Sequence, residues 1–404
     1  MVEILQISAD IVYMQAKSRK ENYISRRITI SHKSTKSLFL FGPRQSGKTT
    51  LLKKRFSDAP YYNLLIDRDY IRFLTDPSVL RDEVLALSKD KMIVIDEIQR
   101  VPALLNEVHA LIEDGYRFIL TGSSARKLKR GSSNLLAGRA RWNQLFPLSI
   151  HELKKDFNFK TAFHCGMLPS LYYSDEPEID LLSYVNTYLK EEIAAEALTR
   201  NIQLFSKFLK LAAMTNTQVL NYSKISIDVG LSSTVIKNYY QILEDTFIGY
   251  FLNPLNSEKK RKAVTTPKFY FFDVGISNYI AKRKSIEKGT PYFGDSLEHL
   301  IHNEIKAYLS YFHPSVEMNY WRTRDQKEVD FVINKNIAIE VKSSNKVKSS
   351  QKSGLQALSE EIELKKKIII YTGERAMSLE NSTDVLPLYL FVEKLWKHEI
   401  LERT

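Results

Sequence analysis

The sequence has little cysteine, glycine or proline. Cys165 is the single cysteine among 404 residues, which excludes an internal disulfide and a cysteine-based zinc site. A chain without disulfides is typical of a reducing compartment, and the cytoplasm fits best. The 14 glycines and 12 prolines are too few for a collagen-like or low-complexity chain.

Long hydrophobic runs are missing as well. No run approaches the roughly 18 consecutive apolar residues of a membrane-spanning helix, and the longest candidates, such as residues 367–371, have the length of strands. The first 20 residues lack a basic start followed by an apolar segment, so we expect no export signal. These absences predict a soluble protein that does not act at a membrane.

Positive charge and apolar residues are plentiful instead. The chain is 44% apolar and 26% charged, and its formal net charge is +12. This surplus favours a polyanionic partner such as nucleic acid, or an anionic membrane surface, although a merely solvated lysine-rich surface is an equal alternative. A length of 404 residues predicts two to three folded domains.

The order of apolar segments predicts an α/β architecture. Strand-like runs at 38–41, 61–66, 92–95 and 117–121 alternate with helix-length segments, as in a parallel sheet covered by helices. Long amphipathic helices follow, at 181–200 and 202–214. The predicted modules are an N-terminal extension with a helix and a basic stretch (1–36), an α/β core (37–150), a helical domain (151–275) and a second α/β domain (276–404).

A phosphate-binding loop follows the first predicted strand. Residues 42–49 match the pattern G-x-x-x-x-G-K-[ST] between a strand and a helix. In such a loop the backbone amides surround the phosphates, Lys48 reaches the β and γ oxygens, and Thr49 ligates Mg²⁺. The predicted ATP-binding residues are Gly42, Pro43, Arg44, Gln45, Ser46, Gly47, Lys48, Thr49 and Thr50. The sequence therefore predicts ATP hydrolysis with Mg²⁺, in which Lys48 also assists catalysis.

Two acids end the strand-like run at 92–95. In that place after a phosphate-binding loop, we expect Asp96 to hold Mg²⁺ through water and Glu97 to orient the attacking water. Ser123 ends the next strand and is our candidate for a sensor of the γ-phosphate. Ordinary turn chemistry explains the segment 122–124 equally well.

Two arginines further along the chain, Arg139 and Arg141, lie where folding does not require charge. Either can serve as an arginine finger, in cis or from a neighbouring subunit, and a structural salt bridge is an equal alternative. The trans alternative implies a homo-oligomer.

Short segments spread along the chain carry a family resemblance: 42–50, 95–99, 120–124, 136–139, 147–149, 166–169, 188–193, 272–275 and 320–322. Together they resemble a family of prokaryotic AAA-type ATPases with a C-terminal domain of unknown function, DUF4143. The resemblance implies a P-loop AAA-type ATPase core, a winged-helix domain and a C-terminal domain with a restriction-endonuclease-like fold. It covers nearly the whole chain from about residue 24 and leaves the N-terminal extension unaddressed.

A second site is indicated in the last module. Asp330 lies in the strand-like run 328–333, and Glu340 and Lys342 end the next run, which gives the pattern D-x9-E-x-K. Residues i and i+2 of a strand share a face, so Glu340 and Lys342 are expected to point into one site that Asp330 completes. The two carboxylates can hold Mg²⁺ while the lysine stabilises a scissile phosphate. Glu298 is a further candidate metal ligand, as in PD-(D/E)xK nucleases.

The pattern D-x9-E-x-K is loose, and two alternatives remain open. Charged strand ends can be solubility devices, and an inactive nuclease-like fold can bind DNA without cutting it. His299 and His302 lie three apart on the preceding helix, where we expect a solvated helix face rather than a metal site because no third ligand of that kind is nearby.

Residues 219–247 predict a helix, a turn at Gly230 and a second helix. Strand-like runs at 248–252 and 268–273 follow, with the basic cluster 259–262 between them, as in a winged helix–turn–helix. Residues 232–240 are then candidates for reading DNA. Winged helices also serve as protein-packing modules, and that alternative has equal weight.

The residues support more than one function. The first hypothesis is an ATP-driven switch or motor that acts on DNA, with a Mg²⁺-dependent nuclease centre behind it. The alternative is a signal-transducing ATPase that binds a protein partner and carries an inactive nuclease-like domain. A nuclease that the ATPase merely gates is a third.

Overall fold

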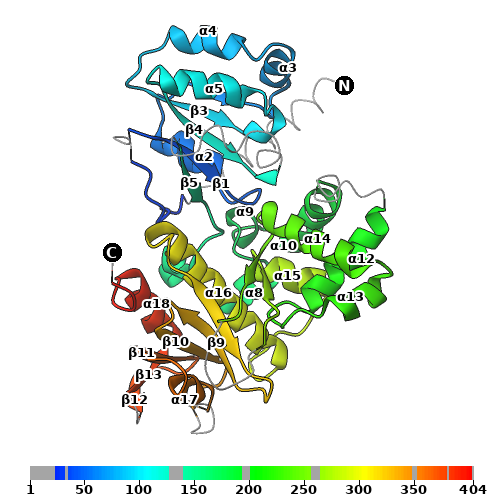
Figure 1. Ribbon diagram of the computed structural model, residues 1–404, viewed down its shortest axis with the longest axis vertical. Helices are drawn as coiled ribbons and strands as arrows, with labels where there is room; N and C mark the ends of the chain where they lie inside the picture. The colour runs from blue at the N-terminus through cyan, green and yellow to red at the C-terminus, as the bar shows by residue number, and fades with distance from the viewer. Residues whose placement is uncertain are drawn as a thin grey trace, which may run out of the picture.

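The computed structural model describes residues 23–31, 35–126, 140–192, 201–255, 264–347, 353–379 and 382–402. Figure 1 shows an α/β module at the top, helices below it and to one side, and a second sheet at the bottom. The expected leading helix, Arg139 and the basic cluster 259–262 lie outside the described residues. Within these ranges no helix has the length and apolar character needed to cross a membrane.

The first module is a parallel sheet with helices on both faces. Its strands are β1 (Ser37–Phe41), β2 (Tyr61–Asn63), β3 (Met92–Asp96), β4 (Arg117–Gly122) and β5 (Ala140–Gln144), in the order β2-β3-β4-β1-β5. All four neighbouring pairs are parallel. The helices are α2 (Lys48–Arg55), α3 (Asp67–Thr75), α4 (Val79–Leu85), the short η1 (Ile98–Arg100) and α5 (Leu104–Glu113).

Side chains of the buried strands alternate between two cores. Phe39 and Phe41 of β1 pack with α3, α4 and α5, whereas Leu38 and Leu40 pack with α2. The predicted parallel α/β core is therefore confirmed. The run at 61–66 forms a strand only to Asn63, because Ile66 already caps α3. Strand β4 lies between β1 and β3 and is parallel to both. The carboxyl ends of these three strands therefore share one edge of the sheet.

Helices dominate the middle of the chain. They are α7 (Ile150–Leu153), η2 (Lys154–Asp156), α8 (Phe159–His164), α9 (Pro169–Tyr172), α10 (Pro177–Ser183), the π-helix η3 (Tyr184–Glu192), α12 (Ile202–Met214), α13 (Tyr222–Val229), α14 (Ser233–Asp245) and α15 (Val274–Ile280). Gly230 ends α13 at φ 85°, and the Ser232 side chain caps α14. The antiparallel pair β6 (Gly249–Leu252) and β7 (Lys268–Phe271) follows, so these elements occur in the predicted order.

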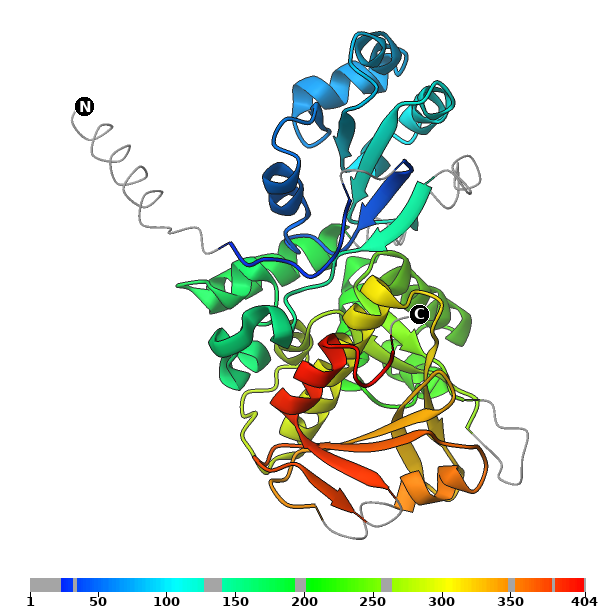
Figure 2. The same cartoon turned by 90° about the vertical axis from the view of Figure 1, so that its left-hand side faces the viewer.

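The last module is a three-layer α/β arrangement. It contains α16 (Pro291–Phe312), β8 (Met318–Arg322), β9 (Glu328–Ile333), β10 (Ile337–Lys342), α17 (Ser353–Ser359), β11 (Lys366–Tyr371), β12 (Met377–Leu379), β13 (Thr383–Pro387) and α18 (Leu388–Trp396). The strand order is β12-β13-β11-β10-β9-β8. Helices α16 and α18 pack on one face and α17 on the other. Helix α16 reaches from this sheet to the base of the first module, as both views show (Figures 1 and 2).

The expectation that His299 and His302 form a solvated helix face is wrong. Both side chains are buried, because α16 is covered by β7 on one side and by the second sheet on another. His302 stacks on Tyr270 with ring centroids 3.9 Å apart. His299 contacts the Phe271 carbonyl through Nε2. Burial lowers the pKa of His299 to about 4, so both rings serve packing in neutral form.

Glu304 of α16 holds the start of α7. Its carboxylate accepts hydrogen bonds from the backbone N–H of Ile150 at 2.7 Å and of His151 at 3.2 Å. It also accepts one from the Trp396 indole at 2.7 Å. The first N–H groups of a helix have no partner inside it, so Glu304 satisfies donors that would otherwise be buried unpaired. Despite these bonds, burial raises the pKa of Glu304 to about 7.

We expect Glu304→Gln to change how stability depends on pH. Because folding raises the pKa of the Glu304 carboxyl, the folded protein loses about 3 kcal/mol of stability as pH rises from about 4.5 to about 7. The variant lacks this titration, so its free energy of unfolding should rise relative to wild type over that window. Urea unfolding at pH 5 and pH 7.5 measures it, with the exposed Glu393→Gln as control. Parallel pH profiles for wild type and Glu304→Gln would contradict the assignment.

Candidate functional site

The phosphate-binding loop connects β1 to α2. Gly47 caps α2 in the left-handed region at φ 93°, where glycine is strongly favoured. A Cβ on Gly42 would lie 2.3 Å from the Leu145 carbonyl oxygen. Both glycines are therefore required by the backbone, as the pattern predicted. Ser46 Oγ is buried and has no hydrogen-bond partner among the described residues, which fits a loop built to receive a polar ligand.

Lys48 is folded back over the loop. Its Nζ donates to the carbonyls of Gly42 at 2.7 Å and Pro43 at 3.0 Å. Burial lowers the pKa of Lys48, while the charges of Glu97 and Asp96 act in the opposite direction. In the described part of the chain the direct partners of this buried ammonium are neutral carbonyls, so it is well suited to receive phosphate oxygens.

Asp96 ends β3 and gathers hydroxyl groups from three segments. Thr49 Oγ1 donates to its carboxylate at 2.8 Å, as expected for two residues that share one Mg²⁺. Tyr61 and Thr121 also donate to it. Burial and the charge of Asp96 raise the pKa of Tyr61, which keeps its hydroxyl a donor. Tyr61 carries no sequence signal, since its role depends on the pairing of β2 with β3.

Glu97 lies in a strained turn beside Ser123. Its backbone is left-handed at φ 62°, which is uncommon for a non-glycine residue and concentrated at functional sites. Ser123 Oγ donates to the Glu97 carboxylate at 3.0 Å. Gln99 Nε2 donates to the same carboxylate and to Ser123 Oγ. The sequence analysis included Gln99 only within the segment 95–99 and assigned it no role. Its position two residues after Glu97 is the one sequence feature that could have indicated this contact.

Arg141 does not lie at this edge of the sheet. It is exposed on β5 and pairs with Leu38 at the start of β1, whereas Gln144 pairs with Phe41 beside the loop. Strands rise about 3.3 Å per residue, so Arg141 is roughly 10 Å from the edge that carries the site. This position disfavours a role in cis. The trans alternative and the homo-oligomer it implies stay predictions.

The helical module touches the loop directly. Ser170 of α9 donates to the Gln45 side chain at 2.7 Å. Tyr184 of η3 donates to the Arg44 carbonyl at 3.3 Å, and the Arg44 guanidinium lies 5.2 Å from the Tyr188 ring centroid. Residues from outside the first module therefore contact two residues of the loop, Arg44 and Gln45.

Asp273 and two glycines hold the segment that precedes α9. The buried Asp273 carboxylate accepts a hydrogen bond from Met167 N at 2.6 Å and also caps α15. Burial raises the pKa of Asp273 to about 6. A Cβ on Gly275 would lie 2.1 Å from Gly166 N, so only glycine permits this approach. These contacts give a structural reason for the motifs at 166–169 and 272–275.

The predicted carboxylate pair of the last module comes together. Asp330 Oδ2 accepts a hydrogen bond from Val341 N at 2.7 Å, and Lys342 Nζ donates to Glu340 Oε1 at 2.5 Å. Glu340 Oε2 is buried without a hydrogen-bond partner among the described residues. Burial raises the pKa of Glu340 to about 7, and burial together with Glu340 raises that of Asp330.

Glu298 lies close enough for its charge to add to burial in raising the pKa of Asp330 and Glu340, but its carboxylate already has two donors. It accepts hydrogen bonds from Lys268 at 3.0 Å and from Tyr270 at 2.5 Å. Lys268 is 3% exposed and also pairs with Glu328 at 2.6 Å, and sequence reasoning had not singled it out. In the described ranges, no three His, Cys, Asp or Glu side chains are grouped to hold a metal ion. A Mg²⁺ site here would depend on Asp330 and Glu340, and the nuclease centre stays a prediction.

Three stretches of the chain match family models. Residues 34–154 match an AAA domain. Residues 156–287 match a domain of unknown function, DUF8612, and residues 293–391 match the domain of unknown function DUF4143. The predicted combination of an AAA-type ATPase domain with a DUF4143 domain is confirmed. A restriction-endonuclease-like character of the latter stays a prediction.

The chain is also similar to uncharacterized proteins of bacteria and an archaeon. One from Mycobacterium tuberculosis is 24% identical over 364 residues, which are 87% of this chain and 79% of the relative. One from Haemophilus influenzae is 25% identical over 355 residues, covering 80% of this chain and 85% of the relative. One from Methanocaldococcus jannaschii is 26% identical over 349 residues, covering 78% and 76%.

Solved structures give weaker matches. The Aeropyrum pernix ORC2 protein in ADPNP–ADP complexes is 13% identical with a TM-score of 0.33, and the match covers 61% of this chain and 88% of that one. The Aeropyrum pernix ORC1 protein in complex with DNA is 12% identical with a TM-score of 0.26, covering 61% and 87%. These TM-scores are too low to relate the folds in detail.

Proposed function

Since the chain carries an AAA-type ATPase domain, we propose that it hydrolyses ATP at the carboxyl edge of its first sheet and that turnover controls an action on DNA. One observation carries the first part. Residues from three separate segments meet at this edge, with Thr49 at 2.8 Å from Asp96 and Ser123 at 3.0 Å from Glu97. A strand–loop–helix turn without nucleotide chemistry needs none of these pairs.

The roles follow from position. The amides of the loop 42–49 and the N-terminus of α2 bind the phosphates, and Lys48 exchanges its carbonyl partners for the β and γ oxygens. Thr49 and Asp96 offer the oxygen ligands that Mg²⁺ prefers, and the ion would neutralise charge on the transferred phosphoryl group. Glu97 orients and polarises the attacking water. Ser123 and Gln99 hold the Glu97 carboxylate, and Ser123 is the proposed sensor of the γ-phosphate.

The action on DNA rests on charge and on the helix–turn–helix. The net charge of +12 favours a polyanion. Helices α13 and α14 with the hairpin β6–β7 have the order of a winged helix. The alternative is a signal-transducing switch that binds a protein partner through the same module.

The DNA hypothesis and the protein-partner hypothesis can be separated by measuring wild-type ATP hydrolysis with and without double- and single-stranded DNA. Binding through several phosphates weakens by orders of magnitude between 50 and 200 mM salt. Stimulation that disappears over this range supports the DNA hypothesis. Hydrolysis that is indifferent to DNA at low salt favours the protein-partner switch.

A second candidate function is Mg²⁺-dependent cleavage of DNA in the last module. The unpartnered Glu340 Oε2 and the raised pKa of Asp330 favour it, because a cation would compensate two buried carboxylates. Lys342 lies beside them to stabilise charge on the scissile phosphate. An inactive nuclease-like fold is the alternative.

We expect Asp330→Ala to reduce Mg²⁺-dependent cleavage at least about a hundredfold and to leave ATP hydrolysis unchanged, because it removes a metal ligand far from the loop. Nicking of supercoiled plasmid and phosphate release measure the two activities on one preparation. Asp384→Ala, at an exposed position on β13, is the matched control. Equal nicking by wild type and Asp330→Ala would show that the activity belongs to another site or to a contaminant.

A further inference from the structure

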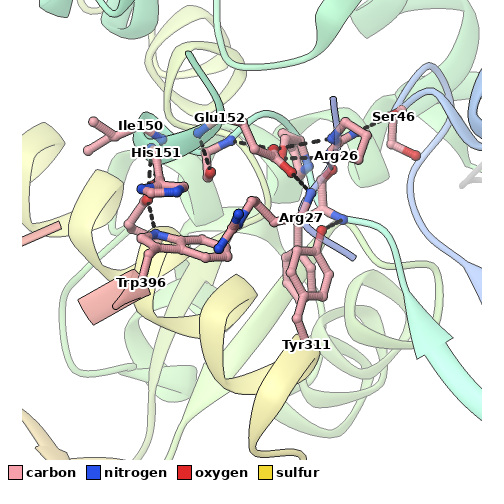
Figure 3. A network of polar contacts seen from close by, with 12 residues as sticks. Arg26, Arg27, Ser46, Ile150, His151, Glu152, Tyr311 and Trp396 are labelled. Atoms are coloured by element: carbon pink, nitrogen blue, oxygen red, sulfur yellow. Dashed lines mark hydrogen bonds and ion pairs between the residues drawn. The ribbon is translucent and has the colours of Figure 1, made fainter. Parts of the chain in front are cut away.

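Arg26 lies against the phosphate-binding loop, although it precedes the first strand. Figure 3 shows its guanidinium between Ser46 and Glu152. Nη1 donates to the Ser46 carbonyl at 2.7 Å, and Nη2 donates to the carbonyls of Phe146 at 2.6 Å and Pro147 at 3.1 Å. One side chain thus joins the loop to the connection between β5 and α7.

The charge of Arg26 is balanced locally. Arg26 Nε lies 3.2 Å from Glu152 Oε2, and the two side chains are 4% and 1% exposed. Burial is the largest single influence and would lower the pKa of Arg26, but the charge and hydrogen bond of Glu152 together with Tyr311 and Tyr23 outweigh it, so the pKa is raised. A neutralised pair attracts a distant phosphate only weakly. Any effect of Arg26 on nucleotide must therefore come from how it orients the loop.

The orientation follows from peptide geometry. A trans peptide points its C=O and the following N–H in opposite directions, and the described residues contain no cis bond. Arg26 holds the Ser46 carbonyl toward its own side of the loop, so the Gly47 N–H points away from Arg26. No acceptor for this N–H is found among the described residues. Gly47 has little conformational restraint of its own, since glycine reaches both signs of φ.

We infer that Arg26 is a positioning residue of the nucleotide site, which holds the Ser46–Gly47 peptide with its N–H toward the phosphates. This deepens the proposed ATPase function and rests on it. Arginine is suited to the task because its planar fork serves three carbonyls and one carboxylate together. A lysine ammonium has three donors on a flexible stem and cannot keep this geometry.

The same contacts reach the last module. Phe146 N donates to Tyr311 OH of α16 at 3.2 Å, and Glu152 accepts a hydrogen bond from Arg27 N at 2.7 Å. Loop geometry thus depends on a residue whose other partners connect to α16. Arg26 lies more than a hundred residues from Phe146 and Glu152 in sequence, so no local pattern marks it.

The test is Arg26→Lys in the full chain, with dissociation constants for ADP and a slowly hydrolysed ATP analogue measured in Mg²⁺. We expect about tenfold weaker binding to the folded variant, and a KM for ATP raised to match with little change in kcat, since charge-assisted bonds are worth one to two decades. Arg283→Lys is the control, because the Arg283 side chain is 6% exposed and pairs with Asp295 at 3.2 Å in another part of the chain. It should lose stability without losing affinity.

A double variant covers the case in which Arg26→Lys does not fold. Arg26→Met with Glu152→Gln removes both charges, so no unpaired charge stays buried, and it lacks the donor to Ser46. It should bind nucleotide about as weakly as Arg26→Lys. Wild-type affinity in either folded variant would overturn the inference while leaving the ATPase intact. Failure of the wild type itself to bind nucleotide would remove the proposed function and this inference with it.

Discussion

Lys48→Ala is expected to reduce ATP hydrolysis by about a hundredfold to a thousandfold. The side chain is buried beside the loop carbonyls and is the nearest cation to the expected β and γ oxygens. Arg26 is not placed to substitute, because its charge is balanced by Glu152. Phosphate release at several ATP concentrations measures the effect, which should also appear as weaker nucleotide binding.

A matched control for this variant lies on the same helix. Lys54 of α2 is exposed, so Lys54→Ala should retain the wild-type rate. The fold should tolerate Lys48→Ala, since removing an ammonium whose pKa is lowered by burial relieves a desolvation penalty. Wild-type hydrolysis by a folded Lys48→Ala protein would show that the loop does not carry the reaction.

The residues of the candidate nucleotide site could be identified from the sequence because their pattern is local. The loop 42–49 directly follows the buried strand β1, and Asp96 and Glu97 lie at the end of the buried strand β3. Parallel strands bring their carboxyl ends to one edge whatever their order, so the placement of β4 between β1 and β3 did not need to be known.

The partners of that site were harder to predict because they depend on tertiary register. Tyr61 reaches Asp96 only because β2 pairs with β3. Arg26 belonged to a stretch that sequence alone marked as basic, and nothing local distinguishes a buried guanidinium from a solvated one. Tertiary register also disfavours a residue that the sequence suggested. Arg141, a candidate arginine finger, pairs with Leu38 and so lies near the start of β5, away from the edge that carries the candidate site.

The last module shows a different limit. The periodicity of apolar residues identified helix α16 but did not show how many of its faces other elements cover. His299 and His302 were therefore expected to be exposed to solvent, although both are buried. The strand alternation correctly paired Glu340 with Lys342. It could not reveal that Lys268, on the distant strand β7, engages Glu298.

Glu97→Gln is expected to slow hydrolysis by about a hundredfold to ten-thousandfold while nucleotide binding is retained. Glutamine keeps the size of the side chain and can still contact Ser123, but it cannot polarise water as a carboxylate does. The variant should therefore bind ATP with near wild-type affinity and release phosphate very slowly. A nucleotide-binding assay beside a single-turnover assay measures both quantities, and Glu113→Gln on α5 is the control.

The contrast between Lys48→Ala and Glu97→Gln is more informative than either variant alone. Loss of binding in the first and of chemistry in the second would separate phosphate binding from water activation within one site. An ATP-loaded Glu97→Gln protein would then show whether DNA binds the nucleotide-bound state before hydrolysis. If Glu97→Gln hydrolyses ATP at the wild-type rate, the strained turn at Glu97 and its contacts with Ser123 and Gln99 serve the fold, and another group must orient the water.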